Sequence, residues 1–197
     1  MHWRLKAYLA FLYICFFTSS VLSHEINVDG KLDDSAWKSA DEYTKYYESL
    51  PFTLNEPKDF QKVLILEDEK GIYLGFINKQ DKETIRANRH ERDDEMANAD
   101  KAGLAIDFDG DGLAAYAFTV SAGGSIADGI YRNENEVNYD WDADWKSGVF
   151  IDQDYWYAEM FIPWSIAPMK AVNGEFREVK LSFWRLLAAE WLSLIHI

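Results

Sequence analysis

Three acidic residues at alternate positions are the first group in the sequence that could carry chemistry. They are Asp107, Asp109 and Asp111, and Gly112 follows at the sixth position of the loop. Oxygen ligands wrapped by a tight turn suit a hard cation, so the loop indicates a calcium site. The twelfth position is Phe118 rather than glutamate, which excludes an EF-hand. The alternative is a solvated hairpin turn, in which Asp and Gly are the preferred residues.

Residues 138–145 interleave aromatic and acidic side chains. Flat rings can stack on the apolar C–H faces of sugars, while carboxylates and amides bind the hydroxyl rims. The segment shows no strand alternation, so Trp141 and Trp145 are the candidate stacking residues for a saccharide. The alternative is that both rings close the open end of the fold, because tryptophan is usually well buried.

The sequence contains few residues that could form a recognisable catalytic site. Glycosidases need two carboxylates at a set separation, and the 34 acidic residues single out no such pair. His24 and His90 are the histidines outside the two ends of the chain, which leaves little for a histidine triad or a zinc site. A net charge of −14 disfavours nucleic-acid binding, because phosphate would be repelled.

Short strand-like runs separated by turn signals recur along residues 24–190. The first two flank a charged loop and predict a hairpin, and their nearly continuous apolar residues indicate a central position covered on both faces. The next two alternate in polarity and predict a second hairpin around the acidic loop. The predicted strands lie within 63–66, 72–77, 102–108, 114–120, 155–162 and 179–184.

Helix signals are confined to residues 33–40, where aspartates precede an Ala-Trp pair and predict a short capped helix. Residues 81–98 are polar and charge-dense, which predicts a long loop that is either functional or mobile. Many short antiparallel strands predict an all-β, jelly-roll-like sandwich with one short N-terminal helix. We expect Trp37, Trp156 and Trp164 in its core, since each lies in an otherwise structured apolar pattern.

Residues 1–23 have the pattern of a secretory signal peptide. A positive start precedes an apolar run at 7–17 that is too short to span a bilayer comfortably, and we expect cleavage after Ser23. The alternative is an uncleaved anchor helix. Cleavage would remove the sole cysteine, Cys15, and change the net charge to −16. We therefore expect an exported acidic protein in the periplasm, in the outer membrane or at the cell surface.

Residues 191–197 look like one reading frame of a transposase sequencing adapter. The alternative is a genuine C-terminal strand, which their β-branched content permits. On the first interpretation, residues 24–190 are a C-terminally truncated module at the front of a longer protein.

Two motifs dominate the order of segments, VDGKLDDSAW at residues 28–37 and YAEMFIP at residues 157–163. With the segments between them, they make residues 24–185 resemble the family 9-like carbohydrate-binding modules. More narrowly, the chain is similar to the N-terminal domain of large exported bacterial proteins of unknown function. In those proteins the module precedes a long β-rich part with a C-terminal outer-membrane barrel.

The resemblance implies a jelly-roll sandwich that binds glycans and is associated with polysaccharide breakdown. In the founding modules, sugar is clamped between two tryptophans and metal is bound elsewhere. The first of these should lie just before the strand that starts near Ala102, but residues 95–100 contain no tryptophan. Arg92, Asp93 and Asp100, on the long loop, are the candidate polar contacts.

We therefore expect an exported module that captures poly- or oligosaccharide in carbohydrate catabolism. A second hypothesis is a periplasmic or cell-surface appendage of a membrane barrel that binds no sugar. A third is a fragment of a glycoside hydrolase.

Overall fold

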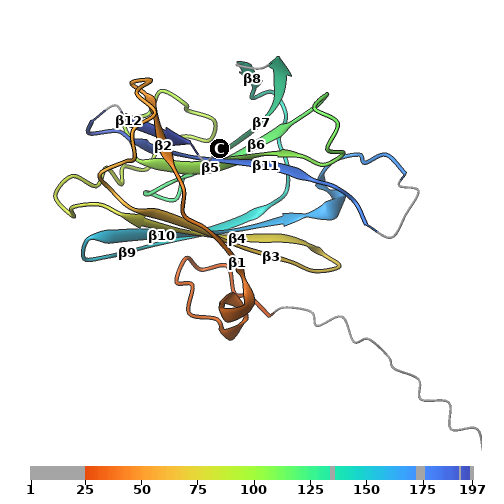
Figure 1. Cartoon of the computed structure of the whole chain (residues 1–197), viewed down its shortest axis with the longest axis horizontal. Helices are drawn as coiled ribbons and strands as arrows, with labels where there is room; N and C mark the ends of the chain where they lie inside the picture. The colour runs from red at the N-terminus through yellow and green to blue at the C-terminus, as the bar shows by residue number, and fades with distance from the viewer. Residues whose placement is uncertain (1–24, 134–135, 172–175, 191, 196–197) are drawn as a thin grey trace, which may run out of the picture.

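The computed structural model describes residues 25–133, 136–171, 176–190 and 192–195, in which two antiparallel sheets face each other as two layers (Figure 1). This confirms the predicted all-β sandwich. The five-stranded sheet has the order β1 (Asp41–Tyr43), β3 (Gln61–Glu67), β4 (Gly71–Lys79), β10 (Tyr155–Pro163) and β9 (Lys146–Asp152). The seven-stranded sheet has the order β2 (Tyr47–Leu50), β12 (Leu192–Ile195), β11 (Lys180–Leu187), β5 (Lys101–Asp107), β6 (Tyr116–Ser121), β7 (Ile126–Asn133) and β8 (Glu136–Asn138).

The core lies between the two sheets and is built from one face of each central strand. Side chains of a strand point alternately to opposite faces, so an alternating run delivers every second residue to the core. In β10 these are Trp156, Ala158, Met160 and Ile162, all fully buried. Both predicted hairpins form, as β3–β4 and as β5–β6, and the alternation that predicted them decides which face is buried.

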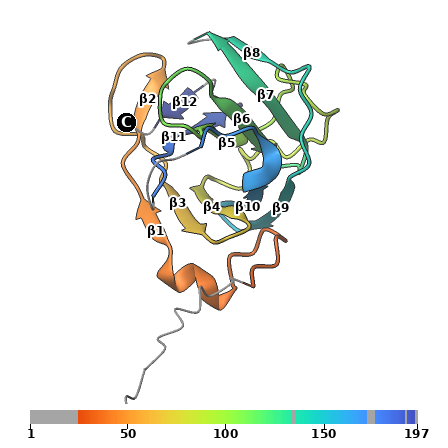
Figure 2. The ribbon, with the colours of Figure 1, turned by 90° about the vertical axis from the view of Figure 1, so that its right-hand side faces the viewer.

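The outer face of the five-stranded sheet is covered by the N-terminal segment, residues 26–40 (Figure 2). Trp37 packs there on Leu64, Leu66 and Tyr73, so β3 and β4 are covered on both faces as predicted. Glu159 of β10 points to the same side and is buried beneath the segment.

Glu159 joins the two motifs that carry the family resemblance. Its carboxylate accepts hydrogen bonds from the backbone N–H groups of Asp29 and Gly30, each at 2.8 Å, and from the Trp37 indole at 2.9 Å. Gly30 has φ +92°, and a Cβ at this position would lie 2.5 Å from the Val149 backbone. The motifs therefore hold the N-terminal segment against the sheet.

The predicted short helix forms as a five-residue 3-10 helix, η1 (Ser35–Ser39). The predicted aspartate cap is wrong, because Asp34 makes no side-chain bond to the helix N-terminus. Its carboxylate accepts the N–H of Asn27 at 2.9 Å instead, which closes the N-terminal segment on itself. A second 3-10 turn, η2 (Trp164–Ile166), follows β10.

Residues 192–195 form β12, which pairs with β11 on one side and β2 on the other. Leu192 and Leu194 are buried and the residues beside them are half-buried, so this part of the tail lies within the sandwich. The adapter origin of residues 191–197 stays a prediction. The expected signal peptide lies outside the described residues, and none of the helices in the described part of the chain is long and apolar enough to cross a membrane.

Candidate functional site

A cavity of about 190 Å³ lies on the outer face of the seven-stranded sheet. Its floor is a row of cross-strand partners, Trp184, Gly103, Thr119 and Ala127, which run from β11 through β5 and β6 to β7. Directly paired residues share one face of a sheet, and their sequence neighbours, such as Phe183, fill the core on the other face. The cavity is therefore open to solvent and separate from the interior.

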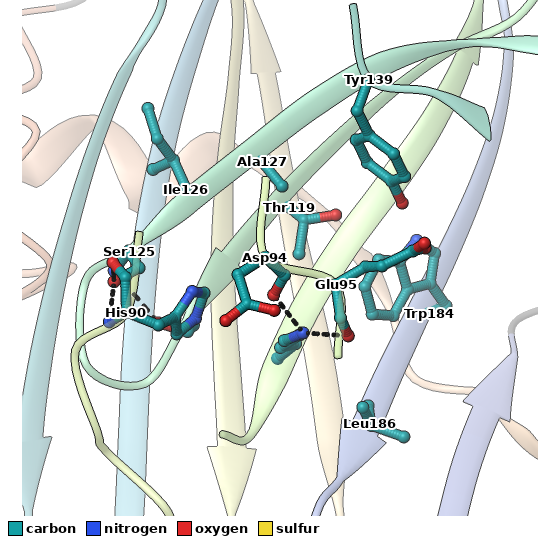
Figure 3. Close-up of a pocket in the computed structure, with 12 residues that line it drawn as sticks. His90, Asp94, Glu95, Thr119, Ser125, Ile126, Ala127, Tyr139, Trp184 and Leu186 are labelled. Carbon is teal, nitrogen blue, oxygen red and sulfur yellow. Dashed lines mark hydrogen bonds between the residues drawn. The ribbon is translucent and has the colours of Figure 1, made fainter. Parts of the chain in front are cut away.

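The floor of the cavity is flat and aromatic because of a glycine. A Cβ on Gly103 would lie 2.6 Å from Trp184 Cζ2, so the indole rests directly on the glycine backbone. Trp184 is half-buried, and the Tyr139 hydroxyl is turned toward Trp184 and Glu95 (Figure 3). Two aromatic rings thus line one side of the cavity.

The loop before β5 forms a wall of the cavity, and Lys101 holds that loop in place. Its ammonium donates hydrogen bonds to the backbone carbonyls of Asp94, at 3.2 Å, and Glu95, at 2.6 Å. Burial lowers the pKa of Lys101, although the neighbouring Asp94 and Glu95 carboxylates oppose the shift. Both carboxylates are exposed, and neither forms an ion pair within the described residues.

Further polar groups reach the cavity from Tyr139 and His90. Burial, together with the hydrogen-bonded Glu95 carboxylate, raises the pKa of Tyr139 to about 12, so its hydroxyl keeps its proton and donates it to Glu95. His90 Nδ1 lies 2.9 Å from the carbonyl of Glu91, which can only accept, so Nδ1 carries the proton in neutral His90. Nε2 is buried and has no partner in the described part of the chain. It is therefore a buried acceptor that the described residues leave unused.

Ser125 fixes the backbone of His90 at the edge of the cavity. The His90 N–H donates to Ser125 Oγ at 2.9 Å, and Ser125 Oγ–H donates back to the His90 carbonyl at 2.8 Å. The cavity thus combines aromatic surface with exposed carboxylates, one of which holds the Tyr139 phenol. Such a set can hold a small polar molecule that has one apolar face.

Trp141 and Trp145 do not line this cavity. The Trp145 ring is buried with its centroid 5.5 Å from that of Phe118, and the half-buried Trp141 lies 5.0 Å from Tyr116 by the same measure. Both belong to the core cluster at the end of the sandwich. This placement matches the alternative interpretation of the segment.

Arg92 and Asp93 meet the 141–145 segment at Asp128, a fully buried carboxylate of β7. Asp128 accepts hydrogen bonds from the Arg92 guanidinium and from the Ala143 N–H, the latter at 2.7 Å. Burial raises the pKa of Asp128, and these two contacts oppose the shift. Arg92 also pairs with Asp142 at 2.8 Å. These residues join two loops beside the cavity and use their polar groups within the protein.

Asp100 is fully buried and its carboxylate is fully engaged. It accepts hydrogen bonds from the Gln80 side chain and from the backbone N–H groups of Arg86 and Ala188, each at 2.8 Å. The expectation of a ligand contact is therefore corrected, because Asp100 ties the long loop to β4 and to the end of β11.

The residues of the acidic loop do not fit a calcium centre. Asp107 accepts three backbone N–H groups, Asp109 binds the Arg177 guanidinium at 2.6 Å, and Asp111 pairs with the Lys170 ammonium. Within the described residues, no group of three or more His, Cys, Asp or Glu side chains could hold a metal ion. The loop instead has the contacts of a hairpin turn, and two of its three carboxylates pair with basic residues.

None of the candidate site residues lines the cavity, so sequence reasoning missed its lining, which includes Trp184, Tyr139, His90, Asp94 and Glu95. A signal for the first was present, because the alternation of residues 179–184 places Trp184 with Lys180 and Ser182 on the solvent face. A large aromatic residue on the polar face of a strand is the informative exception.

No protein-family model and no curated protein matches the chain. A family 9 carbohydrate-binding module from Caldicellulosiruptor kristjanssonii, solved with cellotriose, is similar at 13% identity and TM-score 0.58, over 86% of this chain and 78% of that one. A family 9 module from the same organism, solved with glucose, has 13% sequence identity and a TM-score of 0.59, over 86% of this chain and 80% of that one. A candidate carbohydrate-binding protein from Bacteroides uniformis has 12% sequence identity and a TM-score of 0.55, over 77% of this chain and 76% of that one. These likenesses show that the chain has the β-sandwich fold of family 9 carbohydrate-binding modules.

Proposed function

We propose that this chain is a carbohydrate-binding module and that the cavity on the seven-stranded sheet is its saccharide site. The observation that carries the proposal is the half-buried Trp184 indole lying on Gly103, with the exposed carboxylates of Asp94 and Glu95 in the same cavity. A sugar ring has an apolar C–H face and a hydroxyl rim. Trp184 offers a surface for the first, and the exposed carboxylates of Glu95 and Asp94 offer acceptors for the second.

The size of the cavity favours recognition of one or two sugar rings. Its volume of about 190 Å³ is below the roughly 300 Å³ at which pockets for drug-sized ligands begin. Hydroxyl groups that donate to carboxylates make charge-assisted hydrogen bonds, which are about twice as strong as neutral ones. Two such acceptors at the rim would fix the orientation of a ring stacked on Trp184.

The solved structures of similar fold support the ligand class, because two of them hold cellotriose and glucose. The signal-peptide pattern of residues 1–23 supports export of the module, and a saccharide-capturing exported module fits a role in carbohydrate catabolism. In that role the protein holds a glycan for a partner that degrades it.

Removal of the Trp184 ring tests the proposal. We expect Trp184→Ala to weaken cellotriose binding, measured by calorimetry, at least about tenfold, which corresponds to about 1.4 kcal/mol. Trp184→Phe retains a ring and should lose less. Trp141→Ala is the matched control, because it removes an indole that lies outside the cavity. Equal affinities of the Trp184→Ala variant and the unchanged protein would refute the site.

A further inference from the structure

We propose that the cavity selects saccharides by charge, so that an amino sugar with a free ammonium binds more tightly than its neutral counterpart and a uronate is excluded. This inference rests on the proposed function and names the substrate class of the same site. It follows from which charged groups line the cavity and which of them a ligand can reach.

The charged groups that line the cavity are Asp94, Glu95 and Lys101, with the titratable His90 at the edge. Asp94 and Glu95 are exposed carboxylates without ion-pair partners in the described residues. With neutral His90, the lining carries one net negative charge. The whole chain adds to this field with a net charge of −14.

Lys101 is not a receptor for an anionic sugar, despite its positive charge. Only 4% of its surface is exposed, and its ammonium donates to the carbonyls of Asp94 and Glu95. A carboxylate ligand that displaced these carbonyls would release the loop that forms the wall of the cavity. The Lys101 ammonium, which would otherwise attract an anionic sugar, is therefore already hydrogen-bonded to backbone carbonyls.

The aromatic lining favours a cation as well. An ammonium over the face of Trp or Tyr is attracted by the ring quadrupole when it lies within about 6 Å of the ring centre. Trp184 and Tyr139 lie on the side of the cavity toward which Glu95 extends (Figure 3). An ammonium substituent on a bound ring would thus meet aromatic faces and carboxylates together.

A neutral sugar binds without this added attraction, and a uronate is repelled by the carboxylates of the cavity. Its carboxylate would lie within the same small cavity as Asp94 and Glu95, and like charges at such separations oppose binding. The expected order of affinity is therefore amino sugar, then neutral sugar, then uronate.

The test measures three trimers by calorimetry: the glucosamine trimer, cellotriose and the galacturonate trimer. It is run at a pH below the pKa of the sugar amines, so that the ammonium form is present. We expect the glucosamine trimer to bind about tenfold more tightly than cellotriose, and the galacturonate trimer to bind at least about tenfold more weakly. High salt should shrink both ratios, because these charges are exposed.

Two double variants separate local from global charge. Asp94→Asn with Glu95→Gln should bring the ratio of glucosamine to cellotriose affinity to about one. Asp33→Asn with Glu69→Gln makes the same change in net charge at exposed positions outside the cavity, and should leave all three affinities unchanged.

The possible outcomes distinguish this inference from the proposed function. Equal affinities for the three trimers, or tightest binding of galacturonate, would overturn charge selection while saccharide binding stands. A preference that follows both double variants equally would assign the effect to net charge and overturn the role of Asp94 and Glu95. Absence of binding by all three trimers would overturn both proposals.

Discussion

The two outer faces of the sandwich differ in whether the chain covers them. On the five-stranded sheet, residues 26–40 cover β3, β4 and β10, and Glu159 binds three N–H groups beneath them. On the seven-stranded sheet, the corresponding face carries a cavity with Trp184 half-buried and two exposed carboxylates. One face is sealed by the chain itself, and the other offers its groups to solvent.

This difference shows what the most recognisable motifs of the sequence are for. VDGKLDDSAW and the outward-facing half of YAEMFIP lie on the covered face, where Gly30 and Trp37 both donate hydrogen bonds to Glu159. These motifs specify how the N-terminal segment packs, so they report the fold. The cavity on the open face is built from residues that belong to neither motif.

The largest expected effect is on the covered face. Glu159→Ala should lower the free energy of unfolding by about 3 kcal/mol or more, because it leaves three N–H donors without their acceptor. Urea denaturation measures this loss, and Glu69→Ala, at an exposed turn, is the control. Saccharide affinity of the folded variant should not change. A large loss of affinity would show that the two faces are coupled.

Trp141→Ala should lower the free energy of unfolding by about 2 kcal/mol, since a half-buried ring packed on Tyr116 and Phe118 is removed. Thermal unfolding and affinity electrophoresis on the same sample measure stability and glycan retardation. We expect a lower Tm with retardation intact. The reverse result, intact Tm with lost retardation, would return Trp141 to the role of a stacking residue.

Lys101→Met should have a smaller effect on stability, about 1 kcal/mol, but should weaken saccharide binding several-fold. The substitution keeps an apolar stem and removes the two hydrogen bonds to the loop carbonyls. Calorimetry and denaturation separate the two effects, with the exposed Lys38→Met as the control. If binding survived unchanged, the loop would hold its position without Lys101.

The smallest effect concerns calcium. We expect Tm to be the same with added calcium and with chelator, because Lys170 and Arg177 already neutralise Asp111 and Asp109. A ligand that binds only the native state must raise Tm, so a clear rise with calcium would restore a metal site on the loop.

Sequence reasoning predicted the sheets well because alternation is a local signal. The run at 155–162 buries Trp156 and Met160 between the sheets and turns Glu159 and Phe161 toward the N-terminal segment, as its alternation predicts. The Asp34 cap failed for a local reason too, since a competing backbone N–H at Asn27 took the carboxylate.

The site was predicted less well, because its residues come together through long-range contacts. Asp100 and Asp94 are both acidic residues of one loop, yet one is buried on Gln80 and Ala188 and the other is exposed. Nothing in the neighbouring sequence distinguishes them. The position of the loop depends on Lys101, whose bonds to two carbonyls have no signature in side-chain type.

The bonds that Glu159 makes also set an order of events during synthesis. Asp29 and Glu159 are 130 residues apart in the chain, so the N-terminal segment leaves the ribosome long before β10 exists. Contacts of such separation require a long loop to close and therefore form late. Until then, the apolar side chains of β3 and β4 on that face have no cover, which makes the nascent chain prone to aggregation. The N-terminal segment therefore gains its hydrogen bonds to Glu159 only after β10 has been made, although it precedes every strand in the chain.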